Sequence, residues 1–318
     1  KSRNQREKTG FIILEGKRLI SDAIKVGLKL NTIFFSLEEN LVGIPDLEKL
    51  AEKGVQLKKV FYKDLKHFSE MCTSPGIMGV FERPSNQDIA NSPFCFKENK
   101  LPVTLICDNI RDPGNLGSII RTSAAVGIEK IICVKGCVDP WETKVLRSGA
   151  GAHFRLPIIY NVDWPFIFNH IPFDKSIDVF IADHHVDEDE LIKQNNQIQQ
   201  LRKPLQFNQV LNEETNELMI HEDSYKDEGN LLKYRNANIF TSLYMNVTFF
   251  RESIDKPTAF IVGGETKGLS NQAYKLAYDL VGTRLKIPLS SGMDSLNSSI
   301  AASIILYEMK RQFIVQQT

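Results

Sequence analysis

The sequence lacks several features that would place it in a familiar class. None of its 318 residues lie in an apolar run that reaches the roughly 18 residues of a membrane span. Its 39 basic and 39 acidic side chains give a formal net charge of +0, so overall charge indicates no partner and leaves only local patches. With 42% hydrophobic and 25% charged residues, the composition is typical of a globular chain, and the length allows two domains. We therefore expect no membrane partner.

Cysteine is scarce and carries no pattern that binds a metal. The five cysteines are odd in number and contain no CxxC pair. Cys133 and Cys137 are four residues apart with His153 distant, and His184 and His185 lack a third ligand nearby. We expect reduced, mostly buried thiols of an intracellular compartment and no metal site.

A third absence concerns a glycine turn, VGGETKGLS, at residues 262–270. Gly263 and Gly268 have the spacing of a phosphate-binding loop, but Leu269 stands where that loop requires lysine. Glu265 lies inside the turn and would repel a triphosphate. The segment argues against a nucleotide hydrolase and favours a cationic ligand, or one that offers a hydroxyl or amine donor.

The first part of the chain alternates between strand and helix patterns. Strands are predicted at 30–36, 56–62 and 76–84, helices at 47–55 and 63–71, and a strand leading into a helix over 11–27. This alternation predicts a small α/β unit over residues 1–84. Residues 85–100 are polar with one proline, which favours a linker.

The second part, residues 101–318, contains longer apolar runs. LPVTLICDN, KIICVKG, DVFIADHH, PTAFIVGG and RLKIPL are separated by helical patterns, which predicts a parallel sheet covered on both faces. Ligands of such sheets bind beyond the carboxyl ends of the strands. Residues 187–228 carry eleven acidic against four basic side chains, so we expect a mobile insertion over about 186–243 that projects away from any nucleic acid.

Polar residues follow three of these strands. Asn115 is expected to cap a helix whose buried face leaves Arg121 pointing away from the core. Ser270 is expected to cap the helix after the glycine turn, and Asn297 a final helix rich in small residues. Each feature alone also fits ordinary capping, solvation or tight packing.

Taken together, NIRDPGNLGSIIRTSAAVG, FIVGGETKGLS and KIPLSSGMDSLNSSIAASIILYE resemble the three signature motifs of the SpoU/TrmH family of SPOUT-class RNA 2′-O-methyltransferases. The likeness covers nearly the whole chain except the acidic insertion, and residues 135–158 look most like a mitochondrial branch of the family. It implies a C-terminal trefoil-knotted methyltransferase domain that dimerises, and an L30e-like RNA substrate-binding domain at the N-terminus.

The resemblance also implies a cofactor and an active site. S-adenosylmethionine would be held by backbone groups of three loops. Those positions correspond to Ala182, Gly263, Gly264, Gly268, Ile287 and Leu296. The family's polar active-site positions are matched by Asn115, Arg121, Glu265 and Asn297. Because a guanidinium holds its proton tightly, we expect Arg121 to stabilise the ribose alkoxide or a neighbouring phosphate rather than to act as a base.

The implied substrate is RNA, a guanosine of mitochondrial large-subunit rRNA, and the implied location is the mitochondrial matrix. Six basic residues are expected to meet RNA phosphates: Arg3, Arg6, Lys17, Arg18, Lys144 and Arg147. Surface solvation is the alternative for each. A non-catalytic RNA-binding or ribosome-assembly factor on the same fold remains the competing function.

Overall fold

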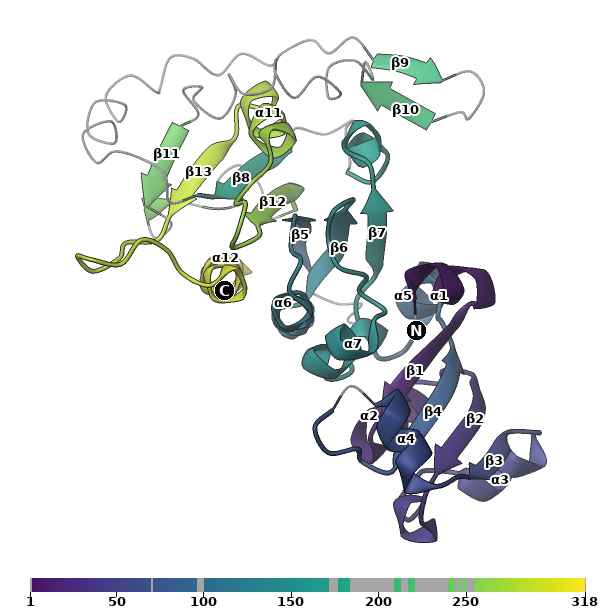
Figure 1. The fold of residues 1–318 in the computed structure, drawn as a ribbon. Coiled ribbons are helices and arrows are strands. Elements are labelled where there is room, and N and C mark those ends of the chain that lie inside the picture. The colour runs from purple at the N-terminus through teal and green to yellow at the C-terminus, as the bar shows by residue number, and fades with distance from the viewer. Residues whose placement is uncertain are drawn as a thin grey trace.

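The computed structural model describes two α/β units, each built on its own sheet (Figure 1). The described residues are 2–69, 71–95, 100–171, 177–183, 209–212, 217–220, 240–243, 246–247, 249 and 255–317. His184, His185 and most of the predicted acidic insertion lie outside them.

A four-stranded sheet forms the N-terminal unit, with strand order β1-β4-β2-β3. Its elements are α1 (Arg3–Thr9), β1 (Phe11–Glu15), α2 (Lys17–Lys25), β2 (Leu30–Phe35), α3 (Leu47–Glu52), β3 (Gln56–Lys59), α4 (Tyr62–Phe68) and β4 (Ile77–Glu82). β2 and β3 are parallel, whereas β4 pairs antiparallel with both β1 and β2. On α2, Leu19, Ile20 and Ala23 are buried, as the helical stripe in the sequence predicts.

The C-terminal unit holds a seven-stranded sheet in the order β11-β13-β8-β12-β5-β6-β7, and every neighbouring pair is parallel. Its strands are β5 (Leu101–Asp108), β6 (Ile128–Val134), β7 (Ile158–Val162), β8 (Asp178–Ala182), β11 (Phe240–Leu243), β12 (Thr258–Gly263) and β13 (Thr283–Lys286). The helices of this unit are α6 (Pro113–Val126), α7 (Thr143–Gly149), α11 (Asn271–Asp279) and α12 (Ser298–Gln317). A separate pair, β9 (Gln209–Asn212) and β10 (Glu217–Ile220), is antiparallel.

Helices cover both faces of the parallel sheet. Leu116 and Ile119 of α6 share one buried cluster with Ile305 of α12, whereas Ala273 and Leu276 of α11 belong to a second cluster. The predicted α/β class with a parallel sheet is therefore confirmed. The trefoil knot and the L30e-like character of the N-terminal unit stay predictions.

Four described elements fall inside segments that the sequence did not assign to either sheet, among them the pair β9 and β10 in the predicted insertion. Within the predicted linker 85–100, Ser85 caps the short helix α5 (Asn86–Asn91). Within the predicted insertion, β11 pairs with β13 and so belongs to the main sheet. The domain boundaries themselves stay predictions.

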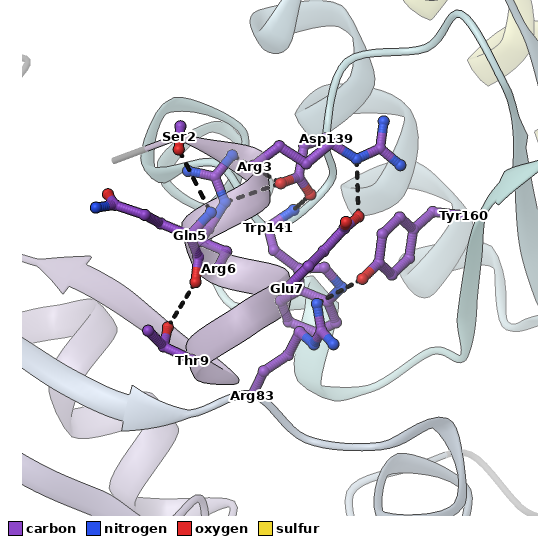
Figure 2. Close-up of polar contacts among 10 residues, drawn as sticks. All are labelled: Ser2, Arg3, Gln5, Arg6, Glu7, Thr9, Arg83, Asp139, Trp141 and Tyr160. Carbon is purple, nitrogen blue, oxygen red and sulfur yellow. Dashed lines mark hydrogen bonds and ion pairs between the residues drawn. The ribbon is translucent and has the colours of Figure 1, made fainter.

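The two units meet at a joint formed by α1 and the loop before α7 (Figure 2). Arg6 Nε lies 2.8 Å from Asp139 Oδ2, and the other carboxylate oxygen accepts the Trp141 N–H at 2.9 Å. Beside them Arg83 donates to the Tyr160 hydroxyl. Trp141 packs in the same buried cluster as the core of the N-terminal unit. A buried ion pair and shared apolar packing thus hold the units together.

His153 gives this joint a dependence on pH. It is fully buried, its ring lies 5.6 Å from that of Trp141, and burial lowers its pKa to about 4 from the ordinary 6.5. Folding lowers the pKa of His153. Its contribution to the free energy of unfolding is therefore complete above the pKa of the unfolded chain and is lost as pH falls towards 4.

We therefore expect the stability advantage of the native chain over His153→Gln to shrink by about 3 kcal/mol between pH 7 and pH 4. Urea unfolding of both proteins across this pH range measures the difference, in which titration of the other groups cancels. A difference that stays constant with pH would contradict the expectation.

Candidate active site

The proposed cofactor residues gather at one edge of the parallel sheet. β8 lies between β12 and β13, and the register places Ala182 opposite Leu285 and Gly263 opposite Asp108. Ile287 follows the end of β13. Since parallel strands end together, Ala182, Gly263 and Ile287 come to the same carboxyl edge, where α/β sheets bind ligands. Leu296 lies just before α12 and is half-buried.

Asp108, at the end of β5, ties both ends of the glycine turn. Its backbone carbonyl accepts the Gly264 N–H at 2.9 Å, and its carboxylate accepts the Ser270 N–H at 2.5 Å. Inside the turn, the Gly268 N–H donates to the Gly264 carbonyl at 2.8 Å, with Gly268 in the left-handed region at φ 63°. The segment that carries Glu265 is thereby fixed, and the sequence reasoning did not identify this role of Asp108.

Burial determines the protonation state of the Asp108 carboxyl that binds the glycine turn. Asp108 is 1% exposed, and desolvation raises the pKa of its carboxyl to about 6, while the hydrogen bond from Ser270 acts in the opposite direction. The pKa nevertheless lies below neutral pH. The carboxylate is therefore ionised there and accepts the Ser270 N–H as a charge-assisted bond.

Gly263 and Gly264 are required by their approach to the protein's own backbone. A Cβ on Gly264 would lie 2.1 Å from the Asn109 carbonyl oxygen, and one on Gly263 would lie 2.6 Å from the Gly268 carbonyl carbon. The sequence analysis assigned these glycines to contact with a cofactor. The geometry shows that packing of two loops against each other already excludes a side chain at both positions.

Three of the four proposed catalytic residues form one hydrogen-bonded cluster. Asn115 Nδ2 donates to Glu265 Oε1 at 2.9 Å, and Asn297 Nδ2 donates to Asn115 Oδ1 at 2.9 Å and also to Glu265 Oε1. These side chains come from α6, the glycine turn and the start of α12. Residues separated by 150 and 182 positions in sequence are thus brought to one point.

The helix ends explain how this cluster is oriented. The N-cap of α6 is Asp112, whose carboxylate accepts the Asn115 N–H at 2.8 Å, so the expected capping role of Asn115 is wrong. Asn115 instead sits in the first turn with its amide free to reach Glu265. Asn297 does cap α12, since its Oδ1 accepts the Ser299 N–H at 2.9 Å while its Nδ2 faces the cluster.

Arg121 lies apart from this cluster. It is exposed on α6, and among the described residues no hydrogen bond or ion pair joins its guanidinium to Asn115, Glu265 or Asn297. Next to it, Thr122 bonds to Ser303 of α12 through hydroxyls 2.9 Å apart. The small residues of α12 therefore permit close packing against α6, and Arg121 remains available at the surface.

Three of the basic residues proposed for RNA contact are engaged within the protein. Arg6 forms the ion pair of the joint, and the Arg3 guanidinium lies 5.5 Å from the centre of the Tyr160 ring. Lys17 Nζ donates to the Glu39 carbonyl at 3.2 Å. All three side chains thus make contacts within the protein, and their role in RNA binding stays a prediction.

The other three differ in exposure. Arg18 and Lys144 are exposed, whereas Arg147 is half-buried on α7. Whether they contact RNA stays a prediction.

The described residues contain no group of three or more side chains of the types that hold a metal ion. Within the same part of the chain, no helix has the length and apolarity to cross a bilayer. All five cysteines are free thiols, and a side-chain hydrogen bond with Cys107, together with burial, raises the pKa of Cys133 well above its ordinary value.

Comparison with known proteins shows which family the chain belongs to. The model of the SpoU rRNA methylase family matches residues 102–205 and 209–307. The chain is 41% identical over 312 residues to the mitochondrial rRNA methyltransferase 3 of Homo sapiens, covering 98% of this chain and 70% of that protein. The chain belongs to the SpoU rRNA methylase family, as its three motifs predicted.

Two further relatives differ in how much of the chain they resemble. A 23S rRNA guanosine 2′-O-methyltransferase of Bacillus subtilis is 29% identical over 161 residues, which is 50% of this chain and 57% of that protein. The crystal structure of the SpoU methyltransferase AviRb from Streptomyces viridochromogenes, in complex with AdoMet, aligns with a TM-score of 0.65 at 22% identity. It covers 99% of this chain and 94% of AviRb, so the whole fold is shared.

Proposed function

We propose that the protein transfers the methyl group of S-adenosylmethionine to a ribose 2′-hydroxyl of RNA, on a guanosine of mitochondrial large-subunit rRNA. The observation that carries the proposal is the Asn115–Glu265–Asn297 cluster beside the glycine turn of a SpoU-family chain. The name of the human relative, a mitochondrial rRNA methyltransferase, supports the compartment and the rRNA substrate. The name of the Bacillus subtilis relative supports the ribose oxygen and the guanosine.

The carboxyl edge of the sheet fits such a methyl donor. Ala182, Ile287 and Leu296 are half-buried, so their apolar atoms remain available to a planar adenine ring. Glu265 is exposed at the same edge, and its negative charge suits a sulfonium cation where it would repel phosphate. Bound there, S-adenosylmethionine supplies an electrophilic methyl carbon.

The residues of the chain then serve the nucleophile. In the reaction the ribose oxygen forms a bond to the methyl carbon, the carbon–sulfur bond breaks, and the hydroxyl proton passes to solvent. Asn115 and Asn297 hold Glu265 in one orientation, and this set orients the ribose by hydrogen bonds. Arg121 supplies positive charge to the developing alkoxide or the adjacent phosphate.

We also propose that the protein is a homodimer that associates through α12. Ile300, Tyr307 and Ile314 are spaced by seven residues on this helix and are 51%, 54% and 49% exposed, and Val315 beside them is 61% exposed. A helix with apolar residues at this spacing presents a stripe that a second helix covers. The stripe starts at the end of α12 that carries the catalytic cluster, so a second copy would lie near the site.

The expected result for Tyr307→Glu and Ile314→Glu is a monomer in light scattering at a concentration where the native protein is a dimer. A charge placed in an apolar interface loses its hydration without a partner, which costs several kcal/mol. Gln317→Glu, at the exposed last residue of the same helix, changes the charge by the same amount outside the stripe and serves as the control. A native chain that is monomeric at all concentrations would contradict the dimer.

Mapping ribose methylation across total RNA, with and without the protein, tests the proposed substrate. The proposal predicts one 2′-O-methylated guanosine in mitochondrial large-subunit rRNA that is lost with the protein. Unchanged ribose methylation together with impaired ribosome assembly would instead identify a non-catalytic assembly factor.

A further inference from the structure

Residues 56–68 form an exposed surface on the N-terminal unit that the proposed active site does not use. They comprise β3, Phe61 and α4, and β3 is the edge strand of its sheet (Figure 1). All four residues of β3 are exposed, and among residues 56–68 every one except Val60 and Leu65 is exposed. We call residues 56–68 the edge surface.

Aromatic side chains are concentrated on the edge surface. Phe61 is 82% exposed, Phe68 57% and Tyr62 43%. In the part of the chain that the structure describes, these three are half of the six exposed large aromatic side chains, although they span only eight positions. Phe68 contacts the ring of His67 edge-on and the Tyr62 hydroxyl donates to the Ser74 carbonyl, but all three rings keep exposed area. Aromatic rings exposed at this density indicate a binding surface.

The edge surface is also basic in a chain whose formal net charge is zero. It carries Lys58, Lys59, Lys63 and Lys66 against a single acidic residue, Asp64. All four lysines are exposed. Lys59 pairs with a glutamate 3.3 Å away, but both side chains are at least 60% exposed and such a pair is weak enough to exchange for a phosphate.

We propose that the edge surface binds an unpaired segment of the RNA substrate, with bases stacked on Phe61 and Phe68 and phosphates held by the flanking lysines. The proposal rests on the proposed function and names where and in what form the RNA is held. Aromatic rings interleaved with lysines match the alternation of base and phosphate in a single strand. A double helix hides the faces of its bases, and an acidic protein would satisfy the lysines without stacking on the rings.

This surface differs from the RNA contacts predicted from sequence. Arg3 and Arg6 lie in the joint between the two units, and Lys17 bonds to a backbone carbonyl. Arg3 and Arg6 thus contact the other unit, whereas the edge surface combines exposed rings with exposed positive charge. The aromatic and basic residues of this surface are visible in the sequence KKVFYKDLKHF, residues 58–68. The same pattern also fits a buried strand and helix, and the exposure of the side chains distinguishes the two.

The test measures binding of the full chain to an unpaired RNA of about 12 nucleotides, with the same strand in a duplex as comparison. Phe61→Ala is expected to weaken binding to the unpaired RNA about 10-fold, because one stacked base contributes on the order of 1–3 kcal/mol. Phe61→Tyr should retain the native affinity. Val42→Ala, an exposed apolar side chain of the same unit, and Lys29→Gln, an exposed lysine at the opposite end of β2, serve as matched controls.

A spectroscopic readout separates stacking from charge attraction. Trp141 and Trp164 are buried. In Phe61→Trp the introduced indole is therefore the exposed one, and it dominates the change in fluorescence when RNA is added. Unpaired RNA is expected to quench its fluorescence, and duplex of equal length is expected to quench it far less. Equal quenching by unpaired RNA and by duplex would overturn the stacking surface in favour of a general anion site. RNA binding that is weakened by Lys63→Gln but not by Phe61→Ala would likewise favour a general anion or acidic-protein site.

The two proposals fail in different ways. If the native chain methylates RNA while Phe61→Ala neither weakens binding nor raises KM for RNA, the edge surface is wrong and the enzymatic function stands. If the native chain transfers no methyl group but Phe61→Ala still loses affinity for unpaired RNA, the surface stands and the enzymatic function is wrong.

Discussion

Replacement of Arg121 by alanine is expected to slow methyl transfer about 100- to 1,000-fold, the usual effect of removing one donor that stabilises a developing oxyanion. Affinity for S-adenosylmethionine should be nearly unchanged, because Arg121 lies on α6 and is not among the residues proposed to hold the cofactor. The side chain is exposed and carries no ion pair to the catalytic cluster, so its loss should leave the fold intact.

Transfer of a tritiated methyl group to RNA and calorimetric titration of S-adenosylmethionine separate the two effects. Arg121→Lys keeps the charge but not the planar fork and should recover only part of the rate. Arg111→Ala removes an exposed arginine from the loop before α6 and should leave transfer unchanged. Undiminished transfer by Arg121→Ala would remove Arg121 from the mechanism.

Replacement of Gly264 by alanine is expected to lower affinity for S-adenosylmethionine by about 10- to 100-fold and methyl transfer at least as much. The new Cβ would lie 2.1 Å from the Asn109 carbonyl oxygen, so β12 and the loop after β5 must move apart. Forced repacking of this kind costs about 1–3 kcal/mol. The displacement also pulls on Glu265, the next residue, and so disturbs the catalytic cluster.

Gly127→Ala is the control for this experiment. Gly127, the residue that ends α6, has φ 81°, and a Cβ there would meet no heavy atom within 4 Å. It therefore imposes backbone strain of about 1 kcal/mol without a clash. Calorimetry should show a much smaller loss of cofactor affinity than for Gly264→Ala, with both proteins folded by circular dichroism. Equal losses in the two variants would show that close packing at Gly264 is not what shapes the site.

Much of the fold follows from patterns that are local in sequence. The apolar run PTAFIVGG becomes β12, and Ser270 caps α11 by accepting the Ala273 N–H, as expected. The long apolar runs form a parallel sheet because strands buried on both faces need no alternation. The family itself was predicted correctly from sequence, because all three motifs are present and follow one another in the family's order along the chain.

The contacts that shape the site were beyond the sequence because they join distant segments. Asp108 looked like the polar end of a strand, yet it fixes the glycine turn 162 residues away. Asn115 looked like a helix cap, but Asp112 takes that position and frees its amide for Glu265. Arg6 was expected to contact RNA phosphates or to be solvated, and its pairing with Asp139 depends on the contact between the two units.

The central claim is that this chain methylates a ribose oxygen of RNA. The most direct test incubates the purified protein with tritiated S-adenosylmethionine and a transcript of mitochondrial large-subunit rRNA, and then digests the RNA with alkali. A methylated 2′-oxygen cannot take part in alkaline cleavage, so the account predicts label in an alkali-resistant dinucleotide that contains guanosine. Bound S-adenosylmethionine without transfer, or label released in ordinary mononucleotides with the methyl group on a base, would contradict it.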